Sequence, residues 1–108
     1  LYAWAEWCPV CRTGEHSISR LVRDPDTPVL TIATQSGDAA AVRAVMAARG
    51  LDWPALVDAD GSLLAQLGLA GVPAFVVIDA DGRVASAELG WTSEAGMRLR
   101  LWWARLRG

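Results

Sequence analysis

Two cysteines, Cys8 and Cys11, are the residues of this chain whose type and spacing indicate chemistry. The spacing Cys-x-x-Cys brings both sulfurs to one face of a helix and within reach of a disulfide bond. A disulfide across so short a loop adds little stability through chain entropy. We therefore expect the pair to carry out reversible dithiol–disulfide exchange, with Cys8 as the nucleophile and Cys11 as the resolving thiol.

The segments around the cysteines predict how they are positioned. Residues 1–5 are typical of a short buried strand that leads toward Cys8. Pro9 fits the first turn of a helix, where its missing N–H is not needed, and the helix is expected to end just before Pro25. Free N–H groups and the helix dipole at this N-terminus favour an anionic sulfur. We expect Cys8 to be exposed and Cys11, one turn further on, to be shielded.

The rest of the chain predicts alternating strands and helices. Asp38 can cap a helix that stops at Gly50, and Asp81-Gly82 is typical of a hairpin turn. The other expected elements are strands at 29–34, 55–57, 75–78 and 84–89 and helices at 62–67 and 93–106. This order predicts an α/β fold with a central mixed sheet flanked by helices. The apolar stripe of the last helix is expected to pack on the sheet; it consists of Leu99, Trp102, Trp103 and Leu106.

Length and composition restrict the function. The 108 residues are 53% hydrophobic, which predicts a single domain over 1–108. The net charge of −2 argues against nucleic acid as a partner. No run of about 20 apolar residues is long enough to span a membrane. Because the chain starts at Leu1, inside the strand expected at 1–5, we expect the first strand to be truncated and a leader or membrane anchor to lie upstream.

Other uses of the two thiols are weaker or remain open. A structural zinc site requires four ligands, whereas the chain has two cysteines and one histidine. No metal site of that kind is therefore predicted, and the exchange reaction needs no cofactor besides the redox-active disulfide. Two thiolates are suitable ligands for Cu(I), so a copper-tolerance protein that binds Cu(I) through Cys8 and Cys11 remains the alternative function.

The string W-A-E-W-C-P-V-C at 4–11 resembles the W-A-x-W-C-x-x-C signature of thioredoxin-like proteins of the TlpA/ResA type. The string G-V-P-A-F-V-V-I-D at 71–79 resembles a second mark of that family, in which the proline is cis and faces the cysteines. The resemblance covers essentially the whole chain and implies the thioredoxin fold. We expect Pro73 to be cis and to stack against the disulfide, leaving the Val72 backbone free to pair with an extended substrate.

Residues 38–58 carry a closer resemblance. They are additional to plain thioredoxin and are similar to the inserted helix and strand of the TlpA-like branch. Pro9-Val10 and Q-S-G-D at 35–38 resemble the suppressor-of-copper-sensitivity D proteins, which are bacterial and exported. This implies a periplasmic, membrane-tethered, monomeric protein. It would act on disulfides of protein substrates and take electrons from a DsbD-like membrane donor. The resemblance favours the reductase direction, although proline after the first cysteine also occurs in oxidising members.

Proton transfer to and from Cys11 requires a partner. The family commonly has a glutamate three residues after the second cysteine, where this chain has Gly14. Glu15, one residue later, can share a helix face with both cysteines and act as a proton relay; the alternative is an ordinary exposed glutamate. Plain thioredoxin has a buried aspartate at the position of Tyr2. Proton transfer through such a carboxylate is therefore expected to be absent in this chain.

Five further residues are expected to contact substrate. Trp7 flanks the cysteines in the first motif, and Trp91 follows a glycine on a loop that lies near the cysteines in this fold. The other three belong to the two motifs themselves: Pro9, Val10 and Val72.

Overall fold

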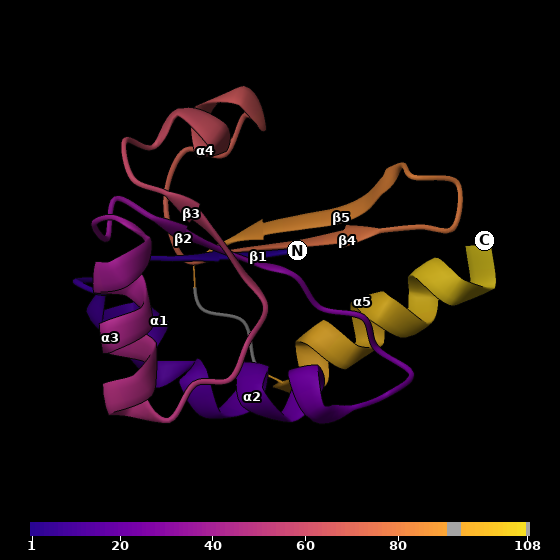
Figure 1. Cartoon of the computed structure of the whole chain (residues 1–108). Coiled ribbons are helices and arrows are strands. Elements are labelled where there is room, and N and C mark those ends of the chain that lie inside the picture. The colour runs from indigo at the N-terminus through magenta and orange to yellow at the C-terminus, as the bar shows by residue number, and fades with distance from the viewer. Residues whose placement is uncertain (91–93, 108) are drawn as a thin grey trace.

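The computed structural model describes residues 1–90 and 94–107, in which five strands form one mixed sheet with helices on both faces (Figure 1). In chain order the elements are β1 (Tyr2–Trp4), α1 (Pro9–Thr13), α2 (Glu15–Arg23), β2 (Thr31–Thr34), α3 (Ala39–Arg49), β3 (Ala55–Asp58), α4 (Ser62–Gln66), β4 (Ala74–Ile78), β5 (Val84–Leu89) and α5 (Glu94–Arg107). The strand order is β3-β2-β1-β4-β5. Strands β1, β2 and β3 are parallel, and β4 is antiparallel to β1 and β5. The expected mixed α/β sheet is confirmed.

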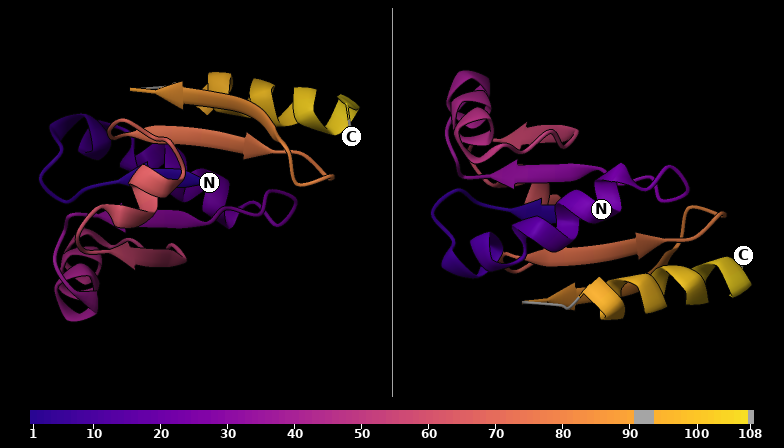
Figure 2. Two further views of the ribbon diagram at one scale, coloured as in Figure 1. Left: turned by 90° about the horizontal axis from the view of Figure 1, so that it is seen from above. Right: turned by 90° about the horizontal axis from the view of Figure 1, so that it is seen from below.

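Strand β1 lies at the centre of the sheet and directs alternate side chains to opposite faces. Tyr2 and Trp4 face the larger core, which also contains buried residues of α2, α3 and α5. Ala3 faces a smaller core beneath α4. Figure 1 shows α2 and α5 on one side of the sheet and α4 on the other, and Figure 2 shows α5 alongside the β4–β5 hairpin with α3 at the opposite edge. The segment that follows β1 is therefore anchored to a strand that is packed on both faces.

Helix α3 begins and ends as its sequence predicts. The Asp38 carboxylate accepts a hydrogen bond from the Ala41 N–H at 2.9 Å, which satisfies one of the free donors of the first turn. Gly50 closes the helix in the left-handed conformation, with φ of 68°.

Replacing Asp38 by alanine removes this cap and is expected to lower the free energy of unfolding by about 1 kcal/mol. Urea denaturation measures the change. Asp38→Asn is the matched control, since it keeps an oxygen acceptor and should retain most of the stability. Equal stability of the alanine variant and the native chain would contradict the capping role.

The single helix expected from Pro9 onward is wrong, because the chain forms two helices separated at Gly14. The Gly14 N–H bonds to the Cys11 carbonyl at 3.2 Å, which closes a tight turn after α1. Glycine is a poor helix former, and a side chain here would lie 3.7 Å from the Tyr2 hydroxyl. As a consequence Glu15 starts a new helix instead of continuing the one that carries Cys11.

The last helix packs on the sheet as expected, but not through the expected stripe. Leu99, Trp102, Trp103 and Leu106 are 53–63% exposed. Instead α5 packs through Met97 and Ala104, both buried, and through the partly buried Leu101. These three positions form a second apolar stripe with helical spacing, and the small Ala104 allows close approach to the sheet. Periodicity alone could not distinguish the two stripes.

Candidate active site

Cys8 and Cys11 lie beyond the carboxyl end of β1, where three separate segments meet. The first is the turn from β1 into α1, the second is the Val72–Pro73 segment before β4, and the third is Gly90 after β5. The Gly90 N–H donates to the Pro73 carbonyl at 2.8 Å, which joins the last two segments. Long-range packing therefore places the residues of both sequence motifs at one end of the sheet.

Cys8 is the N-cap residue of α1. Its sulfur accepts a hydrogen bond from the Cys11 N–H at 3.2 Å and lies 4.0 Å from the Val72 carbonyl oxygen. The Cys8 sulfur thus provides the acceptor for one of the free N–H groups of the first helical turn. Both cysteines are free thiols.

The expected exposure of Cys8 is wrong. Cys8 is 5% exposed and Cys11 is 3% exposed, so the two are equally buried. The reason is the Val72–Pro73 segment, which lies against the Cys8 sulfur and is supplied by a part of the chain remote in sequence.

Cys11 is held in the thiol form. Burial raises the pKa of Cys11 well above its ordinary value, and its hydrogen bond with Cys8 raises it further. A thiol with so high a pKa is uncharged at neutral pH. It requires a nearby group that accepts its proton before it can attack a disulfide.

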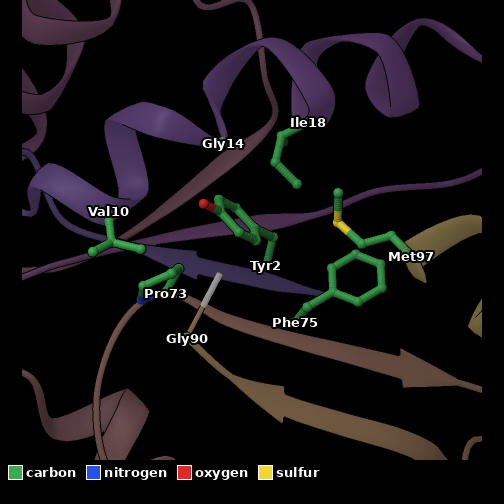
Figure 3. A pocket seen from close by; sticks show the side chains of 8 residues that line it. All are labelled: Tyr2, Val10, Gly14, Ile18, Pro73, Phe75, Gly90 and Met97. Carbon is green, nitrogen blue, oxygen red and sulfur yellow. The ribbon is translucent and has the colours of Figure 1, made fainter. Parts of the chain in front are cut away.

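The Val72–Pro73 peptide bond is cis. Pro73 is buried, and with Tyr2 it borders a cavity of about 10 Å³, close to the size of one water molecule. Figure 3 shows the Tyr2 hydroxyl directed toward α1. The side chains and backbone that line this cavity are Tyr2, Val10, Gly14, Ile18, Pro73, Phe75, Gly90 and Met97.

Apolar side chains lie at the surface around the two buried sulfurs. Trp7 is 54% exposed and its ring N–H donates to the Gln35 carbonyl at 3.0 Å, which fixes the indole beside the site. Pro9 and Val10 are exposed, and Val72 is half-buried. Contact of these four residues with substrate stays a prediction, and Trp91 lies outside the described residues.

Glu15 fits neither of its two expected environments. It does not share a continuous helix with the cysteines, and its side chain is only 19% exposed. One carboxylate oxygen, Oε1, is buried without a hydrogen-bond partner and lies 3.5 Å from the Arg49 guanidinium. A buried carboxylate without a hydrogen bond is costly and marks this group as a candidate for function.

Tyr2 and Arg49 are the two residues at the site that the sequence did not assign a role. Burial raises the pKa of Tyr2 well above its usual value, and the neighbouring acidic groups, Cys11 first, raise it further, so the phenol stays protonated. The buried aspartate of plain thioredoxin corresponds to the position of Tyr2, so the sequence comparison drew attention to this residue. No local sequence pattern marks Arg49.

Among residues 1–90 and 94–107, no three histidine, cysteine, aspartate or glutamate residues are grouped closely enough to bind a metal ion.

Comparisons with known proteins identify the family and the fold. A sequence model of the Redoxin family matches residues 1–98. The soluble secreted antigen MPT53 of Mycobacterium tuberculosis is 34% identical over 83 residues, covering 76% of this chain and 47% of that protein. The chain thus spans about half the length of the curated relatives it matches.

Solved structures extend the comparison to the fold. A secreted M. tuberculosis disulfide oxidoreductase, described as homologous to E. coli DsbE, is 27% identical with a TM-score of 0.77, over 93% of this chain and 76% of that one. The MTB protein DsbF superimposes with a TM-score of 0.83 at 22% identity, over 95% of this chain and 77% of that one. The expected thioredoxin-like fold is confirmed.

Proposed function

This chain belongs to the Redoxin family, and on that premise we propose that it is a protein-disulfide reductase that works through Cys8 and Cys11. The observation that carries the proposal is the hydrogen bond from the Cys11 N–H to the Cys8 sulfur at 3.2 Å. It joins the Cys8 sulfur, at the N-cap of α1, to the backbone of a second thiol that burial holds in the protonated state. These are the properties required of an attacking and a resolving cysteine.

The reaction proceeds in two exchange steps. The Cys8 thiolate attacks one sulfur of the substrate disulfide, forms a mixed disulfide and releases the other substrate sulfur as a thiolate. Cys11 then loses its proton and attacks Cys8, so that the Cys8–Cys11 disulfide forms and the second substrate sulfur leaves. The substrate gains two electrons and the protein loses two, without a further cofactor.

Substrate recognition follows from the surface around the sulfurs. An extended substrate segment pairs with the Val72 backbone, next to the Cys8 sulfur, as one added strand. Pro73 supports this segment from the buried side. The exposed apolar side chains of Trp7, Pro9 and Val10 contact the substrate side chains. Trp91, outside the described residues, is proposed as a further substrate contact.

Glu15 is assigned as the proton acceptor for Cys11, with the Tyr2 phenol nearby. Replacing Glu15 by glutamine is expected to slow decay of the mixed disulfide by about tenfold at neutral pH, because Cys11 then loses its general base. Stopped-flow measurement of that decay between pH 4 and 9 tests the role.

His16→Gln is the matched control, because His16 is the exposed neighbour of Glu15 on the same helix. An unchanged pH–rate profile in Glu15→Gln would remove Glu15 from the mechanism without affecting the roles of the cysteines.

The proposed setting is extracytoplasmic. The curated relatives are named as secreted proteins, which supports a periplasmic or secreted location. No helix within the described part of the chain has the length and apolar character needed to cross a membrane. The proposal also includes a membrane tether, a DsbD-like electron donor and a monomeric state. It further includes the insert at 38–58 and the closer similarity to suppressor-of-copper-sensitivity D proteins.

Reduction of insulin by the dithiol form, combined with equilibration against glutathione, tests the function and its direction. Rapid insulin reduction and a strongly negative reduction potential are expected. Repeating the assay with one equivalent of Cu(I) tests the copper alternative. Tight Cu(I) binding by a protein that does not reduce insulin would contradict the proposed function.

A further inference from the structure

Arg49, the last residue of α3, contacts both ends of the segment that carries the cysteines. One guanidinium nitrogen, Nη2, donates to the Glu6 carbonyl at 2.9 Å, and the other, Nη1, lies 3.5 Å from the Glu15 carboxylate. Glu6 is two residues before Cys8, and Glu15 is four residues after Cys11. The Arg49 side chain is 19% exposed. A single cation from another element therefore spans the reactive segment.

At the first end, Arg49 completes a set of hydrogen bonds around the Glu6 peptide. The Glu6 N–H donates to the Ser36 hydroxyl at 2.8 Å, and that hydroxyl donates to the Thr34 carbonyl at 2.9 Å. The N–H is thus fixed from the β2 side, and the carbonyl from the α3 side. This arrangement fixes the turn that leads into Cys8.

At the second end, Arg49 is the charge partner of a carboxylate with a buried oxygen. Glu15 Oε1 has no hydrogen bond in the described structure, so its ion pair with Arg49 is its stabilising contact. Without this ion pair, a buried carboxylate oxygen that has no hydrogen bond is costly, and the side chain is expected to move out to water. The carboxylate would then leave the position in which Arg49 holds it.

Other ionisable groups also face Glu15. Glu15 and Arg49 border one pocket together with three further ionisable residues, which are Arg12, His16 and Arg23. The Tyr2 phenol on β1 interacts electrostatically with Glu15 and with both cysteines. Arg49 differs from these in that it reaches both Glu15 and the backbone before Cys8.

We propose that Arg49 is a positioning residue that holds the Glu15 carboxylate in place at the start of α2 and fixes the turn before Cys8. The inference rests on the proposed function, in which Glu15 accepts the proton of Cys11. Arg49 does not touch the reacting atoms. It holds the base, through their ion pair, in the place that the resolving step requires.

The test compares four variants by the pH dependence of mixed-disulfide decay. Arg49→Gln keeps a donor for the Glu6 carbonyl and loses the charge. It is expected to slow decay about tenfold at neutral pH and to give the same pH profile as Glu15→Gln. The double variant Arg49→Gln with Glu15→Gln should be within about twofold of either single variant, since both remove one function. Arg49→Lys keeps the charge and should remain closer to the native rate.

Arg43→Gln is the matched control, because Arg43 lies on the same helix, is exposed, and donates to the Ala39 carbonyl of its own helix. It should leave the profile unchanged. Multiplicative losses in the double variant, or equal losses in Arg49→Gln and Arg49→Lys, would overturn the positioning role. If Arg49→Gln does not fold, a native pH profile in Arg49→Lys supports the proposal and an altered one refutes it.

The outcomes also separate this inference from its premise. If the native protein fails to reduce insulin, the proposed function is wrong. If Glu15→Gln leaves the profile unchanged, Glu15 is not the base and Arg49 has nothing to position. If Glu15→Gln alters the profile and Arg49→Gln does not, only the role of Arg49 is wrong.

Discussion

Replacing Cys8 by serine is expected to lower the rate of insulin reduction at least a thousandfold, to that of the uncatalysed reaction. The variant lacks the sulfur that receives the Cys11 N–H and that makes the first attack. A hydroxyl cannot replace it, because at neutral pH it is not ionised and forms no disulfide. The buried Cys11 cannot substitute either, since burial raises its pKa and keeps it protonated.

Replacing Cys11 by serine is expected to have a different consequence. The first attack through Cys8 remains possible, but the mixed disulfide with the substrate is no longer resolved and accumulates. Mass spectrometry of the product under non-reducing conditions detects the trapped complex, which should be absent with Cys8→Ser. Trapping by Cys8→Ser and none by Cys11→Ser would show that the two roles are reversed.

Local sequence signals predicted the elements whose ends are set by local interactions. The cap at Asp38 and the left-handed Gly50 determine both ends of α3. The same local reasoning failed at Gly14, where a single glycine separates two helices. It also failed for α5, because two apolar stripes compete and contact with the sheet selects the one containing Met97 and Ala104.

The candidate site divides in the same way. The spacing of Cys8 and Cys11 and the proline before β4 were readable in the sequence, because each depends on a short motif. The burial of Cys8 was not, since Val72 covers it from a distant part of the chain. Nor was the contact of Arg49 with Glu6 and Glu15, which joins residues more than 30 positions apart.

Asp58, at the end of β3, is expected to be among the most important polar residues for stability. Its buried carboxylate accepts hydrogen bonds from the Leu63 and Leu64 N–H groups at 3.0 and 3.1 Å and from the Thr34 hydroxyl at 2.9 Å. It thereby supplies the side-chain cap that Gly61 cannot give to α4. One carboxylate joins β2, β3 and α4.

Replacing Asp58 by asparagine is expected to lower the free energy of unfolding by about 2–3 kcal/mol at pH 7. The amide has one oxygen in place of two, so at least one of the three donors loses its acceptor, and the bonds that remain are to an uncharged group. Urea denaturation measures the loss. Asp52→Asn is the control, because Asp52 is exposed and its replacement should leave stability unchanged.

The effect of Asp58→Asn should also depend on pH. Burial alone would raise the pKa of Asp58, but the hydrogen bonds from Leu63, Leu64 and Thr34 outweigh it and hold the pKa below its usual value. A depressed carboxylate pKa stabilises the folded state above the unfolded-state value of about 4, and this stabilisation is lost as the pH falls through the lower folded-state value. The stability difference between the native chain and Asp58→Asn should therefore be full at pH 7 and shrink below about pH 4. A difference that stays constant down to pH 2 would mean that shape rather than charge makes Asp58 stabilising.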